Sequence, residues 1–184
     1  MRTYSFCPVC GAGNLRQGTD EVPPSDVLLC GSCCFHFWQN SKPAVGALIP
    51  RKLRGAWHVL LTRRGIEPYK GMWDAPGGFL GNGELPEDGL RRELREELGV
   101  EVSRPRFLVA QVDQYLRDDV AEQARFVLSL FYTCEIPADS ILKPADDIVE
   151  AAWFPLDSPP ADLAFEANHR ALDHLRRLIG TTDA

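Results

Sequence analysis

The sequence lacks any long uncharged apolar stretch. Nothing in its 184 residues approaches the roughly 20 apolar residues in a row that a membrane-spanning helix needs. The first residues, MRTYSFCPVCG, also lack the apolar segment of a secretory signal peptide. These absences predict a cytoplasmic protein without a membrane partner.

An excess of basic residues is missing as well. Lysine and arginine total 20 against 26 aspartates and glutamates, which gives a formal net charge of -6. Broad electrostatic binding to nucleic acid needs clustered positive charge, so nucleic acid is not an expected partner. The run Arg51-Lys52-Leu53-Arg54 is a local exception, which we interpret as a solvated loop while a basic patch stays open.

Cysteines are few, but four of the six stand in two CxxC pairs, Cys7 with Cys10 and Cys30 with Cys33. Each CxxC turn directs two thiolates at one metal ion, so two turns together complete a four-cysteine zinc site. The polar segment between the pairs has too few hydrophobic residues for a core of its own, so zinc would supply the folding free energy. Two disulfides or four unrelated cysteines are the alternatives, and a reducing compartment disfavours the disulfides.

The remaining cysteines, Cys34 and Cys134, are expected to be free, with Cys134 buried in a strand. His36 is expected at the surface, because four cysteines already satisfy zinc. A polar linker, residues 39–43, ends in proline and marks a domain boundary. We therefore predict a zinc ribbon over residues 1–40 and a second domain over residues 41–184.

The second domain alternates strand-like and helix-like periodicities. Apolar segments rich in β-branched and aromatic residues predict strands over 44–50, 56–64, 106–116, 125–136 and 150–156. A closing helix over 168–179 carries leucines expected on its buried face, Leu172, Leu175 and Leu178. Strands on both sides of one central helix predict an α/β fold of the α/β/α sandwich type with a mixed sheet.

Pro86, which suits a first helical turn, and the acidic residues that follow it predict the start of the central helix. Leucines recur every four residues and predict a buried stripe made by Leu90, Leu94 and Leu98. On an adjacent face, three carboxylates gather at i, i+3 and i+4: Glu93, Glu96 and Glu97. Because like charges repel at this spacing, a hard divalent cation, Mg²⁺ or Mn²⁺, is the natural compensation. A solvent-exposed, salt-bridged helix face is the alternative.

A glycine-rich loop precedes this helix, and glycines there let a ligand approach the backbone. Gly78, five residues, Glu84, seven residues and then RELREELGV from Arg92 to Val100 match the Nudix box at every specified position. The chain therefore resembles the Nudix hydrolases, in particular the branch with an N-terminal four-cysteine zinc ribbon that includes ADP-ribose, FAD and NADH pyrophosphatases.

The resemblance implies a set of roles for these residues. Glu93, Glu96 and Glu97 would hold the catalytic metal with the carbonyl of Gly77, and Arg92 would orient the glutamates. Glu84 would fix the loop to the helix. The general base in this family is either the residue matching Glu93 or an acid from a later loop, which here offers Asp118, Asp119 and Glu122. We rank Glu122 first, with a plain polar hairpin tip as the alternative.

The implied reaction is hydrolysis of a pyrophosphate bond that links a nucleoside diphosphate to another moiety, with release of AMP. Substrate contacts are expected from Gly78 and Tyr115, with a core or interface aromatic as the alternative for Tyr115. Arg63 and Arg64 are expected as phosphate clamps, although strand neighbours point to opposite faces and one of the two is expected to face solvent. Three further aromatic residues are interpreted first as ordinary core residues, with stacking on an adenine or flavin ring as the alternative: Trp73, Phe79 and Phe165.

ADP-ribose and FAD are the favoured substrates. The SQPW-type signature of NADH pyrophosphatases has no counterpart after the box, so NADH is an alternative, as is a diadenosine polyphosphate. A non-catalytic module that senses nucleotides or associates with RNA is the alternative of another class. The ribbon serves either recognition or dimerisation, and a homodimer is expected.

Overall fold

The computed structural model describes residues 4–18, 27–115 and 125–182. These residues form two compact units. One takes in the N-terminal residues to Ser41 together with residues 114–115 and 125–126, and the other takes in the rest from Lys42 onward.

The N-terminal unit contains a small antiparallel sheet of order β1-β2-β3. Its strands are β1 (Leu15–Gln17), β2 (Val27–Cys30) and β3 (His36–Trp38). The buried residues of this unit are Cys7, Val27, Leu28 and Cys30. So small an apolar core agrees with the expectation that packing alone does not hold this segment.

The second unit is built on two sheets. The first has the order β8-β4-β10-β9, from β4 (Lys42–Leu48), β8 (Gly77–Phe79), β9 (Ser103–Tyr115) and β10 (Arg125–Glu135). The second has the order β11-β6-β5, with β7 also paired to β6, from β5 (Pro50–Leu53), β6 (Ala56–Arg64), β7 (Trp73–Asp74) and β11 (Ile148–Pro155). Because β4 runs parallel to β10 and antiparallel to β8, the predicted mixed sheet is confirmed.

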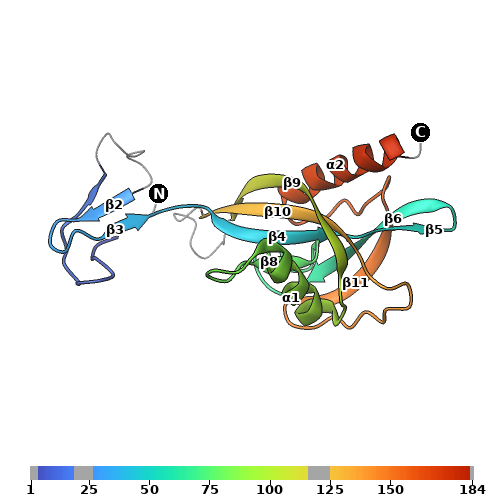
Figure 1. The fold of residues 1–184 in the computed structure, drawn as a ribbon, viewed down its shortest axis with the longest axis horizontal. Helices are drawn as coiled ribbons and strands as arrows, with labels where there is room; N and C mark the ends of the chain where they lie inside the picture. The colour runs from blue at the N-terminus through green and yellow to red at the C-terminus, as the bar shows by residue number, and fades with distance from the viewer. Residues whose placement is uncertain (1–3, 19–26, 116–124, 183–184) are drawn as a thin grey trace. The chain divides into compact units, whose positions relative to one another are not determined.

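Two helices, α1 (Pro86–Leu98) and α2 (Glu166–Thr182), cover opposite faces of these sheets (Figure 1). Successive strand side chains point to opposite faces. Accordingly Ala47 and Ile49 belong to the core that contains the leucines of α1, whereas Leu48 belongs to the core that contains α2. The α/β/α sandwich is confirmed. In the described ranges, no helix combines the length and the apolar composition that crossing a lipid bilayer requires.

Helix α1 follows the sequence prediction closely. It begins at Pro86, and Leu90, Leu94 and Leu98 are all fully buried. Gly99 ends it in the left-handed region at φ 66°, where its N–H bonds back to the carbonyls of the last turn. The helix therefore presents a fixed face, which carries the three glutamates.

Helix α2 differs from its prediction at one position. Leu172 and Leu175 are buried as expected, but Leu178 is 47% exposed, so its placement on the buried face was wrong. The helix buries Ala167 and Ala171 instead. A stripe of leucines at three-residue steps drifts around a helix of 3.6 residues per turn, and small alanines allow the first turns to pack closely.

The basic run at residues 51–54 is not a solvated loop, contrary to our interpretation. Its first three residues belong to β5, which pairs with β6. The Arg51 guanidinium lies 4.4 Å from the ring centroid of Trp153 and donates to the carbonyls of Ile136 and Pro137. Stacking and hydrogen bonding let an arginine occupy a strand within a charged stretch.

The first turn of α2 is capped by a residue from another element. Asp113, on β9, accepts a hydrogen bond from the backbone N–H of Ala167 at 2.6 Å. We expect Asp113→Ala to lower the free energy of unfolding by about 1–2 kcal/mol, because a helix N-terminal N–H loses a charged acceptor. Denaturant unfolding measures this. Asp173→Ala, an exposed acid on the same helix, is the control and should change stability by less than about 0.5 kcal/mol. Equal losses in both variants would contradict the capping role.

Candidate functional site

The carboxylate site lies where the glycine loop meets α1. The N–H of Gly77 donates to Glu97 Oε2 at 2.9 Å. Glu97 is 4% exposed, and this burial raises its pKa to about 9, helped by the nearby carboxylates of Glu93, Asp74 and Asp147. A buried carboxylate thus sits among other carboxylates, which is the arrangement that demands a cation.

Arg92 connects the glutamates around it. Its guanidinium forms a bidentate pair with Glu84, with Nε–Oε1 2.7 Å and Nη2–Oε2 2.9 Å. Nη1 donates to Glu93 at 2.8 Å and to Glu96 at 3.0 Å. The hydrogen bonds from Arg92 and from the N–H of Gly81 lower the pKa of Glu84 to about 2. One arginine therefore holds three carboxylates in place and ties the loop to the helix.

The donor set fits a hard divalent cation. Glu93, Glu96 and Glu97 on α1 offer carboxylate oxygens, the ligand type that such an ion prefers, and the backbone N–H of Gly77 lies beside Glu97. Arg92 pairs with the first two, whereas Glu97 forms no ion pair within the residues that the structure describes. An unpaired carboxylate this deeply buried is unfavourable until a positive charge reaches it.

Gly77 cannot be replaced without backbone strain, and Gly78 lies directly against Glu93. Gly77 has φ 145°, and a Cβ there would lie 2.1 Å from the carbonyl oxygen of Val45. A Cβ on Gly78 would lie 2.6 Å from the carboxyl atoms of Glu93. The glycine pair therefore allows the loop to pack directly against the glutamates.

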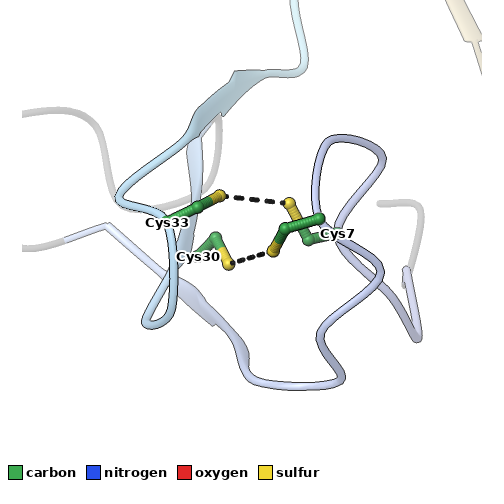
Figure 2. Close-up of side chains that lie close together, drawn as sticks. Cys7, Cys30 and Cys33 are labelled. Carbon is green, nitrogen blue, oxygen red and sulfur yellow. Dashed lines mark hydrogen bonds between the residues drawn. The ribbon is translucent and has the colours of Figure 1, made fainter.

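The N-terminal unit carries a second cluster, formed by the thiols of Cys7, Cys10, Cys30 and Cys33. All four sulfurs lie within 4.8 Å of one another, and none is in a disulfide. Figure 2 shows Cys7 facing Cys33, with Sγ atoms 3.7 Å apart, and the Cys10–Cys30 pair is 3.6 Å apart. Tetrahedral zinc with Zn–S bonds of about 2.3 Å separates its sulfurs by about 3.8 Å, so the cluster fits such an ion.

The backbone around the cluster favours thiolates. The N–H of Val9 donates to Cys7 Sγ at 3.4 Å. Hydrogen bonds from the backbone N–H groups of Cys33 and Ser32 lower the pKa of Cys30 to about 6, whereas the hydrogen-bonded thiol of Cys10 and burial raise the pKa of Cys33 to about 12. Because metal binding needs deprotonated thiols, Cys30 is prepared for a cation by these amides, and Cys33 would release its proton when the ion binds.

The other cysteines lie as expected. Cys34 is exposed, whereas Cys134 is 2% exposed and burial raises its pKa to about 12. His36 is exposed on β3 and hydrogen-bonds to the Cys34 carbonyl at 3.0 Å. Its place at the surface agrees with the prediction.

Comparison with known proteins identifies the larger unit. A family model described as the NUDIX domain matches residues 40–175. This chain belongs to the Nudix family. The crystal structure of a NUDIX hydrolase from Nitrosomonas europaea is similar, with a TM-score of 0.69 and 27% identity over 92% of this chain and 88% of that one.

Two curated proteins of the Nudix family are similar in sequence to this chain. The NAD-capped RNA hydrolase NudC of Pseudomonas aeruginosa is 27% identical over 159 residues, or 86% of this chain and 50% of that protein. The ADP-ribose pyrophosphatase of Methanocaldococcus jannaschii is 31% identical over 118 residues, or 64% of this chain and 66% of that protein. The chain therefore spans about half the length of the NudC proteins that it matches.

Two acids near the Nudix helix were missed by the sequence analysis, Asp74 and Asp147. The loop before β11 crosses the end of α1, where the N–H of Ala145 donates to the Glu97 carbonyl at 2.9 Å. This places the Asp147 carboxylate close enough to raise the pKa of Glu97. Asp146 and Asp147 stand directly before β11, and this acidic pair was the available sequence signal. Only the tertiary fold brings it to the helix.

The two arginines proposed as phosphate clamps both have protein partners. Arg63 Nε donates to the Gly71 carbonyl at 2.8 Å, and its Nη1 lies 3.3 Å from Glu150. Arg64 Nη1 donates to Asp74 at 2.7 Å, and the pair is largely buried. Arg63 is the more exposed of the two, so it is the better placed to meet a ligand.

Of the remaining predicted ligand contacts, the structure describes the three aromatic side chains but not Tyr115 or the acids that follow it. Tyr115 ends β9, but its side chain lies outside the described residues, as do Asp118, Asp119 and Glu122. Among the proposed stacking aromatics, Trp73 is buried edge-on against Phe154, and Phe165 meets Tyr69 in the same way. Phe79 is 46% exposed beside the Nudix loop.

Proposed function

We propose that this protein is a divalent-metal-dependent hydrolase of the pyrophosphate bond in molecules that link a nucleoside diphosphate to another moiety, with ADP-ribose or FAD as substrate. The observation that carries this is Glu97, a carboxylate buried among other carboxylates and beside the Gly77 backbone. Membership of the Nudix family and the similarity to an ADP-ribose pyrophosphatase support it.

In this proposal Glu93, Glu96, Glu97 and the Gly77 carbonyl hold Mg²⁺ or Mn²⁺. The bound ion would neutralise the pyrophosphate and lower the pKa of an attacking water. Arg92 keeps the glutamates oriented through its hydrogen bonds. Hydrolysis then yields two products that each end in a phosphate, one of them AMP.

The proton of the attacking water needs an acceptor within reach. Glu93 is one candidate and Glu122 another, as the sequence analysis proposed. Asp147 joins them, because it approaches Glu97 from the loop before β11.

For the N-terminal unit we propose a structural Zn²⁺ held by Cys7, Cys10, Cys30 and Cys33. The sulfur spacing and the amide hydrogen bonds support this ion. The homodimer stays a prediction, with the zinc unit serving dimerisation or substrate recognition.

NAD(H) is the second candidate substrate, because several relatives are named NAD-capped RNA hydrolase NudC. Product identification by mass spectrometry tests both. The protein is incubated with Mg²⁺ and ADP-ribose, FAD, NADH, diadenosine tetraphosphate or an NAD-capped RNA, beside Glu97→Gln. AMP from ADP-ribose or FAD that disappears in the variant supports the proposal. Cleavage confined to NADH or the capped RNA selects the second candidate, and binding without cleavage selects the nucleotide-sensing alternative.

Arg92→Lys tests how the glutamates are held. Lysine keeps the charge but not the bidentate fork, so Glu84 and Glu93 lose their common partner. We expect kcat to fall roughly 10–100-fold with the fold intact, as measured by steady-state kinetics and circular dichroism. Arg91→Lys, at the neighbouring half-exposed position, should change kcat less than about twofold. An unchanged kcat in Arg92→Lys would show that the fork is dispensable.

A further inference from the structure

Asp74 lies at the centre of a buried polar network outside the Nudix box. Its Oδ2 accepts a hydrogen bond from Arg64 at 2.7 Å, and its Oδ1 accepts one from the side-chain amide of Asn168, also at 2.7 Å. Asn168 is 2% exposed. Three elements, β6, β7 and α2, thus meet at one carboxylate.

The network stands at the start of the turn that reaches the cation site. Thr62 Oγ1 donates to the Asp74 carbonyl at 3.3 Å, and the Pro76 carbonyl accepts from the N–H of Ala47 at 2.8 Å. The next residue is Gly77, whose N–H binds Glu97. Asp74 and Gly77 are therefore the two ends of one short turn that hydrogen bonds hold in place.

Stability alone does not account for this network. A buried ion pair is often no more stabilising than apolar residues of the same size, because both charges lose their water. Burial raises the pKa of Asp74 even though Arg64 and Asn168 act in the opposite direction. The Asp74 carboxylate is also near enough to raise the pKa of Glu97. A costly buried charge next to the cation site points to a role at that site.

We infer that Asp74 is a positioning residue for the cation site, and that it acts through its hydrogen bonds to Arg64 and Asn168. The inference rests on the proposed function, since it assumes that Glu97 and the Gly77 carbonyl bind a divalent cation. In this arrangement Asn168, in the first turn of α2, helps to position the metal-binding carbonyl of Gly77.

An exchange of donor and acceptor tests the inference. Asp74→Asn leaves one acceptor oxygen in place of two and removes the charge that pairs with Arg64, and Asn168→Asp places two carboxylates together, so each single variant weakens the network. The double variant restores one donor and one acceptor and keeps the net charge. Mn²⁺ affinity, measured by electron paramagnetic resonance on the folded full-length protein, should fall roughly tenfold or more in each single variant. It should return to within about threefold of the wild type in the double variant.

The controls separate the possible failures. Asp173→Asn removes the same charge from an exposed position of α2 and should leave Mn²⁺ affinity unchanged. If the wild type binds no Mn²⁺, the proposed function fails. If it binds, but both single variants bind equally well after correction for the folded fraction measured by denaturant unfolding, Asp74 is only structural and the inference is overturned. If the double variant binds Mn²⁺ as weakly as the single variants do, the hydrogen bond between residues 74 and 168 does not position the cation site, and the inference is overturned.

Discussion

Replacing Glu97 with glutamine should abolish most hydrolysis, with kcat falling roughly 10²–10⁴-fold. A divalent cation contributes several kcal/mol to transition-state stabilisation, and about 1.4 kcal/mol corresponds to a tenfold change in rate. Glutamine keeps an oxygen for the N–H of Gly77 but loses the charge that a cation requires. Steady-state kinetics with Mg²⁺ and the substrate identified by mass spectrometry measure this loss.

The same variant should gain stability at high pH when no Mg²⁺ or Mn²⁺ is added. The folded protein holds the pKa of Glu97 at about 9, above its ordinary 4.5. The folded state therefore binds more protons than the unfolded state between these values, and wild-type stability falls as pH rises through this window. Glutamine does not titrate. Denaturant unfolding should show an advantage for Glu97→Gln that is absent at pH 4 and exceeds about 1.4 kcal/mol at pH 8.

Glu96→Gln is the matched control for the stability measurement. Glu96 has the same charge and lies one residue away on α1, but its side chain is 49% exposed. Its replacement should give no comparable gain in stability at pH 8. If the Glu97→Gln protein retains the wild-type kcat, Glu97 has no role in catalysis.

Cys30→Ser should unfold the N-terminal unit and leave the Nudix unit folded. Few residues of the N-terminal unit are buried, and two of them are metal-ligand candidates, Cys7 and Cys30. Structural zinc contributes on the order of 10–16 kcal/mol in small zinc-binding domains, far more than this core can replace. Elemental analysis should find one zinc per wild-type chain and none in the variant, and limited proteolysis should remove the N-terminal residues of the variant alone.

Cys34→Ser is the control for this experiment. Cys34 follows Cys33 directly, but its thiol is exposed and lies outside the four-cysteine cluster. The control should keep its zinc and its resistance to protease. Zinc retained in Cys30→Ser would contradict the four-cysteine site.

Local signals were enough to predict α1 and the glutamates that it carries. Pro86 marks its start, and the leucine stripe fixes which face is buried. Leu178 was misplaced because leucine periodicity overlooked the buried alanines of α2. The strand β5 was missed because its charged residues are stabilised by a distant ring and distant carbonyls.

The rest of the candidate site depends on contacts between segments far apart in the chain. Asp147 and Asp74 come from separate loops and strands, and only the fold brings them near Glu97. Asn168 looks like an ordinary polar residue of an amphipathic helix, yet it is buried against Asp74. A sequence pattern reports spacing along one element, so convergence of this kind has no local signature.

The parallel pairing of β4 with β10 also has a consequence for how the chain folds. β4 is the first strand of its unit, yet it lies between β8 and β10, and its parallel partner is contributed by the second half of the chain. During synthesis, the apolar run of Val45, Ala47 and Leu48 leaves the ribosome long before β10 exists to pair with it. Pairing over such a separation closes a large loop, which slows folding. We therefore expect nascent chains that end before β10 to remain open and to depend on chaperones until β10 emerges.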